Sequence, residues 1–481
     1  MSVSRAVASN TVVQVAGKFA GNVLGIITIA IMTRALGRDG YGAFTTAISF
    51  LQFFGILVDF GLTLTMVRMI SEERADVSRV ASNIFTLRIV SGAVFFGLAP
   101  VLALAFPYPP QVKTAIAIGA LSFFAMTSSQ VLTGVFQKHL ATGRAALADV
   151  LGRAALLLGA WHAAARGAGL LAFVAAFVLG NVVQLTVTFI AARKFARIRP
   201  AFDLGFWRKI VRESWPIGVS IAFNLIYLKG DVIILSLTRT QGEVGLYGAA
   251  YKVLDVITVI PMIFMGLVLP LLSSAWSGGR KDEFGRKLGK AFDALSLLAL
   301  PLAFGTFAVA SDLMAFVAGP QFAASGPFLA ILMLAGAAVF WSALFGHTVV
   351  AIGLQRKMIF AYAADAALSL ALYVWAVPRY GGPGAAWVTV FSEAFIMVAT
   401  AWAVIAATGV TLKLRTFLRA ALASALMAAA VASLASLHVL LRVAVGAAVY
   451  AALLAIFGIL NKETLSFLRK PNAASTGPVL Q

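Results

Sequence analysis

Two short stretches decide how this chain is organised: LGRDGYGAF at Leu36–Phe44 and QGEVGLYGAA at Gln241–Ala250. Each places Tyr-Gly-Ala after a glycine-rich segment and at the start of a long apolar run, and the two tyrosines, Tyr41 and Tyr247, are 206 positions apart. Because the same tripeptide stands at the same point of two apolar runs, the pattern predicts that the chain contains a duplicated unit.

A second pair of stretches repeats at a similar spacing. RGAGLLAFV at Arg166–Val174 and GGPGAAWVT at Gly381–Thr389 align Gly169 with Gly384, 215 positions apart. The alternative is that short Gly-Ala matches arise by chance in a chain with 42 glycines.

Apolar runs of about 20 residues recur along the whole chain. Each is long enough to cross a hydrocarbon core about 30 Å thick as a helix, and the alternating pattern of barrel strands is absent. We therefore predict an all-α polytopic membrane protein with about fourteen transmembrane helices. The predicted spans are 11–33, 42–67, 82–106, 113–137, 145–164, 168–192, 211–237, 246–276, 286–311, 325–352, 357–378, 383–408, 415–438 and 441–460.

The composition agrees with this class and excludes several others. Of 481 residues, 61% are hydrophobic and only 12% are charged, whereas soluble domains carry about 25% charged residues. The chain has no cysteine, so disulfides and thiolate metal sites are excluded, and we expect no metal. A phosphate loop of the Gly-x-x-x-x-Gly-Lys-Ser/Thr type is also absent, so we expect no nucleotide and no other cofactor.

The basic residues predict the orientation. If the N-terminus is cytoplasmic, 26 of the 38 Lys and Arg residues fall in inner segments, seven in outer loops and five within spans. This asymmetry places both termini in the cytoplasm. It also accounts for the net charge of +20 without a nucleic-acid partner.

The two repeats and the even number of spans per repeat predict two parallel six-helix lobes around a central cavity, an architecture of transporters. We expect the N-terminal lobe at residues 1–200, the C-terminal lobe at 201–410, and two further spans with a cytoplasmic tail at 411–481.

Several motifs, in order, resemble one known family, the Wzx-type polysaccharide and O-antigen flippases. In the first half they are TRALGRDGYGAF, ILVDFGL (Ile56–Leu62) and VRMISEE (Val67–Glu73). In the second half they are FNLIYLKGDVIILS, VGLYGAAYKV, VLPLLSS and AVPRYGGPGAAWVTVFSE, the last at Ala376–Glu393. The resemblance covers roughly residues 5–410. This family belongs to the larger superfamily of multidrug, oligosaccharidyl-lipid and polysaccharide exporters.

The resemblance implies a function. It implies that spans 1, 2, 7 and 8 line the cavity and that the chain moves undecaprenyl-diphosphate-linked oligosaccharide units from the cytoplasmic to the outer leaflet of a bacterial inner membrane. The implied setting is the biosynthesis of O-antigen, exopolysaccharide or capsule, with membrane lipids and a polymerase of that pathway as partners. The alternatives within the superfamily are a lipid II flippase and a multidrug exporter.

A diphosphate cargo needs fixed positive charge in the cavity, because Lys and Arg donate charge-assisted hydrogen bonds to phosphate oxygens. Cations within spans are costly, so each is a candidate for function. The candidates for binding the cargo are Lys18, Arg34, Arg88, Lys229 and Lys252. The alternative is local pairing, as for Lys252 with Asp255 three residues later and for Asp149 with Arg153 four residues later, or snorkelling of Lys18 to the surface.

Coupling to an ion gradient needs a carboxylate that binds a proton or sodium. The candidates are Asp59, Asp231 and Asp255, and the alternative is that they neutralise nearby cations. Pro261 and Pro270 make span 8 a candidate gating helix, against the alternative of a static kink.

The glycines of the repeated motif carry a further expectation. We expect Gly40–Gly42 and Gly245–Gly248 to form tight outer turns in which glycine tolerates positive φ. Tyr41 and Tyr247 would then be aromatics at the membrane interface.

The alternative from a different functional class is a membrane enzyme, such as an O-antigen polymerase or a lipid-linked glycosyltransferase. Such enzymes resemble multispan proteins with a large outer loop that carries catalytic carboxylates or arginines. Here the longest outer loop, around residues 311–325, has only Asp312 as a charged group. We therefore expect a transporter and no catalytic residue.

Overall fold

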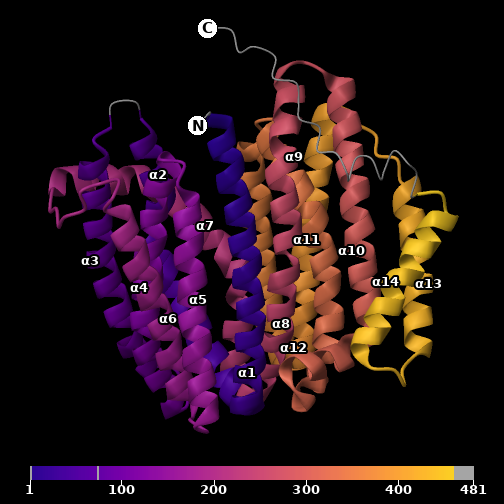
Figure 1. Cartoon of the computed structure of the whole chain (residues 1–481), viewed down its shortest axis with the longest axis horizontal. Helices are drawn as coiled ribbons and strands as arrows, with labels where there is room; N and C mark the ends of the chain where they lie inside the picture. The colour runs from indigo at the N-terminus through magenta and orange to yellow at the C-terminus, as the bar shows by residue number, and fades with distance from the viewer. Residues whose placement is uncertain (1–2, 73–74, 460–481) are drawn as a thin grey trace.

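The computed structural model describes residues 3–72 and 75–459, without the side chains of residues 3–12, 15, 216–217 and 219–229. Every element in the described residues is helical (Figure 1). The elements are α1 (Val3–Asp59), α2 (Leu62–Ser71), α3 (Val77–Leu104), α4 (Pro110–Lys138), α5 (Thr142–Ala165), α6 (Leu170–Ala192), α7 (Leu204–Thr238), α8 (Gln241–Ile257), α9 (Val259–Ser277), α10 (Lys281–Ala318), η1 (Pro320–Ser325), α11 (Gly326–Ala351), α12 (Gln355–Thr408), α13 (Arg415–Ser433) and α14 (Val439–Ile456).

Ten helical segments of the described residues are long and apolar enough to cross a membrane. The all-α multi-pass class is therefore confirmed, while the number fourteen stays a prediction. The count differs by four. Two of the four arise because α1 and α12, of 57 and 54 residues, each run through a sharp bend, at Gly37 (φ 67°) and at Gly381 (φ 61°), and are counted once; the other two are α5 and α7, which are not among the ten. A straight helix of 57 residues would be about 85 Å long, far more than a bilayer core, so each bend returns the chain toward the membrane.

The helices gather on two sides of the molecule. In Figure 1, α2 to α6 lie on one side and α8 to α12 on the other, with α1 between them and α13 and α14 at the outer edge of the second group. Arg442 anchors that edge, because its buried guanidinium pairs with Asp312 and donates to the Ala308 carbonyl at 2.7 Å. The lobe boundaries predicted near residues 200 and 410 stay a prediction.

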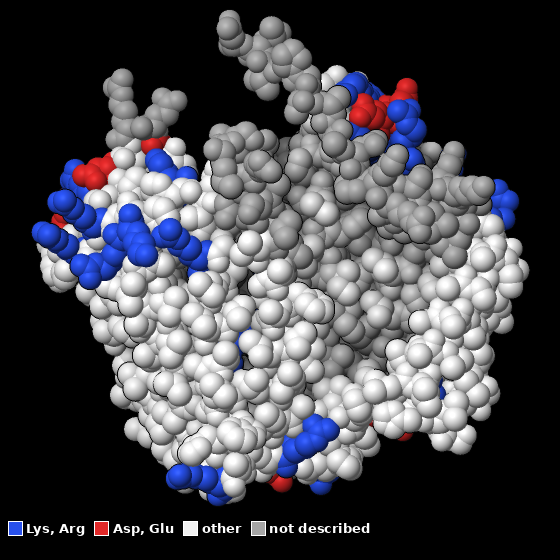
Figure 2. Space-filling model, viewed as in Figure 1, with Lys and Arg blue, Asp and Glu red and all other residues white. Residues whose placement is uncertain are grey.

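The two ends of the molecule differ in charge. We call the end with the bends at Gly37 and Gly381 the bend end, and the end with the α2–α3 and α9–α10 connections the charged end. Figure 2 shows Lys and Arg gathered along the rim at the charged end, an uncharged band below it, and few cations at the bend end. This is the asymmetry that the sequence predicts, although which end faces the cytoplasm stays a prediction.

The hydrophobic core also differs between the ends. At the bend end a single cluster joins both groups of helices, since Met32 and Tyr41 of α1 share it with Tyr247 of α8 and Phe322 of η1. At the charged end there are two separate clusters, one built on α2, α3, α4 and the start of α7, the other on α9, α10, α11 and α12. The two groups are therefore fused at one end and packed independently at the other.

The helix α7 connects the two groups. Its first turns lie against α2 and α3, where Asp203 accepts from Arg79 at 2.8 Å and Glu213 pairs with Arg68. Its last turns lie against α8 and α12, where Asp231 accepts from the Tyr247 hydroxyl at 2.6 Å. A rigid movement of one group against the other would therefore act on both ends of α7.

Candidate functional site

The repeated Tyr-Gly-Ala motifs meet where α1 crosses α8 at the bend end. A Cβ added to Gly42 would lie 1.7 Å from the Gln241 carbonyl oxygen, and one added to Gly245 would lie 2.1 Å from the Arg38 carbonyl oxygen. Thr46 of α1 donates to the Gln241 side chain at 2.7 Å across the same crossing. The glycines therefore allow two helix backbones to touch, as small residues do at helix crossings in membranes.

Two expectations for this motif are wrong. Gly40, Gly42, Gly245 and Gly248 lie within helices without positive φ, and the positive φ that turns the chain falls earlier, at Gly37. The tyrosines are not at an interface, because Tyr41 is 2% exposed and Tyr247 is fully buried in the shared core. The sequence pattern marked the right residues, but it did not distinguish a glycine that permits a turn from one that permits close contact.

Arg34 fastens the same end. Its guanidinium donates to the Val317 carbonyl at 2.7 Å and the Phe316 carbonyl at 2.5 Å, in the last turn of α10. These carbonyls have no partner within their own helix, and the end of the helix carries partial negative charge, so a cation there is stabilised. Arg34, predicted to bind cargo, is therefore placed as a latch between the two groups of helices.

A second set of contacts holds the α7–α8 turn against the bend of α12. Glu243 accepts from the Gly382 backbone N–H at 2.7 Å, and Arg239 donates to the Pro378 carbonyl at 2.9 Å. The bend end is thus closed between the two groups by packing and by the Arg34 latch, while this polar contact holds the second group together at that end.

Between the groups, just on the charged-end side of the crossing, lies a narrow cleft of about 40 Å³. Its walls are Thr45, Ile48, Ser49 and Gln52 of α1 on one side and Val232, Tyr251, Lys252 and Asp255 of α7 and α8 on the other. Lys252 and Asp255 pair at 3.2 Å and both stay partly exposed. Of the five predicted cargo-binding cations, Lys252 is the one that the described residues place in this cleft.

The other candidate cations lie elsewhere. Lys18 is exposed on the first arm of α1, about five helical turns from the Gly37 bend toward the charged end. The side chain of Lys229 lies outside the described residues. Arg153 pairs with Asp149 at 3.0 Å, as its spacing predicts, and donates to the Gly21 carbonyl of α1.

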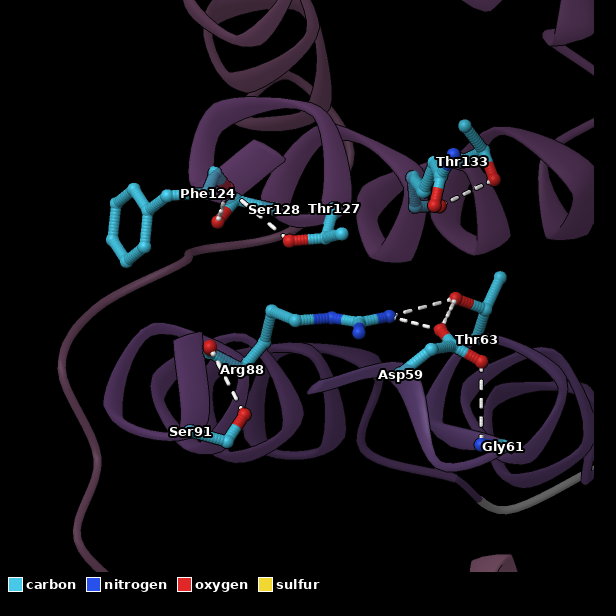
Figure 3. A network of polar contacts seen from close by, with 10 residues as sticks. Asp59, Gly61, Thr63, Arg88, Ser91, Phe124, Thr127, Ser128 and Thr133 are labelled. Carbon is cyan, nitrogen blue, oxygen red and sulfur yellow. Dashed lines mark hydrogen bonds and ion pairs between the residues drawn. The ribbon is translucent and has the colours of Figure 1, made fainter. Parts of the chain in front are cut away.

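Arg88 and Asp59 were predicted for separate roles, and the structure brings them together (Figure 3). The α1 helix ends at Asp59, and the chain continues into α2 through a break at Phe60 (φ 38°) and Gly61 (φ 79°). Asp59 accepts from the Thr63 hydroxyl at 2.6 Å and the Gly61 N–H at 3.2 Å, and it pairs with the fully buried Arg88. This arrangement supports the alternative in which Asp59 neutralises a cation and stabilises a break between two helices.

The second group of helices holds buried carboxylates of a different kind. Asp365 of α12 is fully buried and accepts from Ser392 at 2.8 Å and Ser369 at 3.1 Å. Asp231 of α7 is also fully buried and accepts from Tyr247, while Tyr373 contacts Thr389 at 3.0 Å nearby.

The second group also contains a cavity of about 510 Å³, which we call the polar cavity after the polar residues in its lining; of the residues just named, Thr389 lines it. Its polar lining residues are Tyr251, Asp255, Thr258, Ser342, His347, Tyr362, Thr389 and Glu393. The sequence selected Asp231 and Asp255 but passed over Asp365 and Glu393. In the sequence each of them is a single carboxylate within an apolar span. Ser369 follows Asp365 by four residues, and Ser392 stands directly before Glu393.

The predicted bend of span 8 is present, and it precedes the prolines. Span 8 is divided at Thr258 into α8 and α9, three residues before Pro261, while Pro270 lies inside α9. Proline at 261 lacks the N–H that would bond to the Ile257 carbonyl, which accounts for the break. Whether the break moves as a gate stays a prediction.

Known proteins resemble this chain in sequence and in fold. A family model described as polysaccharide biosynthesis protein matches residues 7–276. A probable low-salt glycan biosynthesis flippase of Haloferax volcanii is 23% identical over 390 residues, which are 78% of this chain and 79% of that protein. The succinoglycan biosynthesis transport protein ExoT of Rhizobium meliloti is 21% identical over 314 residues, which are 65% of this chain and 62% of that one.

Solved structures share the fold at lower identity. The lipid II flippase MurJ in an inward closed conformation superimposes with a TM-score of 0.77 at 14% identity, covering 93% of this chain and 98% of that one. An inward-facing multidrug resistance transporter of the MATE family superimposes with a TM-score of 0.66 at 12% identity, covering 83% and 98%. At these identities the likeness shows the fold alone.

Proposed function

This chain belongs to the polysaccharide biosynthesis protein family, and we propose that it carries lipid-linked oligosaccharides across a membrane by alternating access. The observation that carries the proposal is the contrast in packing, with one shared core at the bend end and two separate cores at the charged end. Two bodies joined at one end enclose a cleft that is open at the other end. If the bodies rock against each other, the open end closes and the joined end opens. The names of the glycan flippase and the succinoglycan transport protein support a glycan cargo.

In this proposal the cargo is an undecaprenyl-diphosphate-linked repeat unit, moved from the cytoplasmic to the outer leaflet of a bacterial inner membrane. Both termini are cytoplasmic, so the charged end faces the cytoplasm and the cleft of this structure opens inward. The flipped unit passes to a polymerase of the same pathway.

Lys252 is the residue that we assign first to the diphosphate. Lys252 lines the cleft with its side chain 44% exposed, and its partner Asp255 keeps it in place until an anion arrives. Lys18 attracts the same anion nearer the charged end. Arg34 and Arg88 have partners in this conformation, so they hold the protein together rather than meeting the cargo first.

Coupling to an ion is assigned to the second group of helices. Of the three predicted carboxylates, Asp231 is the most deeply buried, since it is fully buried whereas the side chains of Asp59 and Asp255 are 18% and 38% exposed. Asp231 and Asp365, together with Glu393 in the wall of the polar cavity, offer oxygen ligands to a proton or sodium.

The test uses a strain depleted of this protein. Lipid-linked glycans are extracted, and the fraction that an impermeant reagent reaches from the outer leaflet is measured. We expect a complete repeat unit to accumulate in the inner leaflet and wild-type protein to clear it. The variant Lys18→Ala/Lys252→Ala should fail, whereas the control Lys281→Ala, an exposed lysine at the start of α10, should act as wild type.

Two results would replace the proposal. Accumulation of the peptidoglycan precursor instead of a glycan repeat unit would make the chain a lipid II flippase. Sensitivity to organic cations without accumulation of any lipid-linked glycan would make it a multidrug exporter.

A further inference from the structure

The bend of α12 forms a tight helical hairpin with an apolar outer face. At the bend the two arms touch, since a Cβ on Gly384 would lie 2.8 Å from the Ala376 carbonyl oxygen. Large apolar side chains are exposed on both arms, including Val374, Val398 and Trp402. In a membrane protein such a face is turned to lipid.

Near the bend this face is hollowed into a groove of about 420 Å³. Aromatic rings form much of its wall, and Trp375, Tyr380 and Trp387 are each 50–58% exposed, which leaves their faces free to contact another molecule. None of the lining residues of the groove lines the polar cavity or the cleft between the groups. The groove is therefore a separate site from the proposed path of the cargo.

An exposed cation, Arg379, lies at the rim of the groove, next to Pro378, whose carbonyl accepts from Arg239. Arg379 is exposed, its guanidinium carbon lies 5.3 Å from the centroid of the Trp375 ring, and its Nη1 donates to the Trp375 carbonyl at 2.8 Å. Within the described part of the chain Arg379 forms no ion pair, and its other nitrogens have no hydrogen-bond partner. The ring holds the guanidinium in place while several N–H groups point away from the protein and are able to bind an anion.

We propose that this groove is a binding site for one anionic phospholipid, with an acyl chain between Trp375 and Trp387 and the phosphate on Arg379. Trp and Tyr prefer the depth at which the apolar core gives way to head groups. The groove would therefore lie beside the acyl chain of a lipid, and Arg379 beside its head group. A guanidinium beside an apolar groove binds a lipid phosphate through charge-assisted hydrogen bonds.

The experiment measures retained lipid on the full-length protein by native mass spectrometry after exchange into phosphatidylglycerol or phosphatidylcholine. We expect wild type to retain one phosphatidylglycerol about fivefold more strongly than phosphatidylcholine, the preference that one basic group contributes. Arg379→Gln should abolish this preference. The matched control is Arg166→Gln, an exposed arginine at the outer turn between α5 and α6, and it should keep the preference.

The apolar wall is tested separately. Trp387→Ala should weaken retention of both lipids, whereas Trp402→Ala, an equally lipid-facing tryptophan 72% exposed on the same helix, should not. Equal losses in Arg379→Gln and Arg166→Gln would mean that only general surface charge acts, and the site would be disproved. Displacement of phosphatidylglycerol by an undecaprenyl-diphosphate-linked glycan would overturn the assignment of the occupant.

Discussion

The bend end and the charged end of this protein are built by different means. At the bend end α1 and α8 touch through glycine, and bulky apolar residues from both groups fill one core around Tyr41 and Tyr247. At the charged end each group has its own core, and ion pairs such as Arg68–Glu213 and Arg79–Asp203 tie only α7 to its neighbours. Close backbone packing depends on shape and is lost abruptly, whereas exposed ion pairs contribute little and reform easily.

This difference assigns separate tasks to the ends. A transporter that alternates between two states has to break and remake one closure in each cycle, so the closure at the bend end must be complete but not permanent. Glycine contact supplies it without covalent or deeply buried ionic links, because the two backbones separate without leaving charges unpaired.

The largest expected effect comes from locking the bend end. A Cβ on Gly248 would lie 3.3 Å from the Thr45 Cβ, close to the separation in a disulfide, and the chain has no cysteine of its own. We expect Thr45→Cys/Gly248→Cys to form a disulfide under oxidation and to stop transport completely, with recovery on reduction. Transport is measured as the outer-leaflet fraction of lipid-linked glycan.

A cross-link within one group provides the control for the lock. Ser129 and Thr188, whose hydroxyls are 3.0 Å apart between α4 and α6, give the pair Ser129→Cys/Thr188→Cys. This disulfide should leave transport intact. If both disulfides stop transport, movement within the first group matters as well, and the rocking of two bodies is the wrong description.

The next effect comes from preventing the closure. Gly42→Ala places a methyl group 1.7 Å from the Gln241 carbonyl oxygen, so α1 and α8 are forced apart. We expect transport to fall to a small fraction of wild type and the Thr45–Gly248 disulfide to form far more slowly in this background. Gly266→Ala, at a glycine of α9 with open space around it, should change neither rate. Unchanged cross-linking in Gly42→Ala would contradict the glycine closure.

A smaller effect is expected at the latch. Arg34→Gln removes two charge-assisted hydrogen bonds to the end of α10, which we expect to destabilise the closed bend end by about 1.5 kcal/mol, or roughly tenfold in the ratio of closed to open protein. The rate of Thr45–Gly248 cross-linking reports this ratio, and Arg166→Gln serves as the control. An unaltered cross-linking rate together with lost cargo binding would return Arg34 to the role predicted from the sequence.

The sequence predicted the helical class, the duplicated motif and the asymmetry of charge, because each depends on composition or spacing along the chain. It also predicted the Lys252–Asp255 and Asp149–Arg153 pairs, which are local on one helix. What it missed depends on distant contact. Nothing in the spacing of Asp59 and Arg88 shows that they meet across two helices, and nothing near Tyr41 shows that a second tyrosine motif covers it.

The smallest effect is expected at the charged end, where it depends on pH. Hydrogen bonds from Arg79 and from the Phe206 backbone N–H lower the pKa of Asp203, the residue that caps the start of α7. A carboxyl with a lowered folded-state pKa adds stability above its unfolded pKa of about 3.9 and loses it as the pH falls through the folded value. Asp203→Asn should therefore melt slightly below wild type at neutral pH, and the two curves should converge in acid.

The control for this last comparison is Asp282→Asn, at an exposed aspartate in the first turn of α10 that forms no ion pair within the described residues. It should melt as wild type does at every pH. If Asp203→Asn lowers transport as strongly as Gly42→Ala does, the ion pairs at the charged end also bear on the cycle. A change confined to melting would leave the glycine contact at the bend end as the closure that transport has to break.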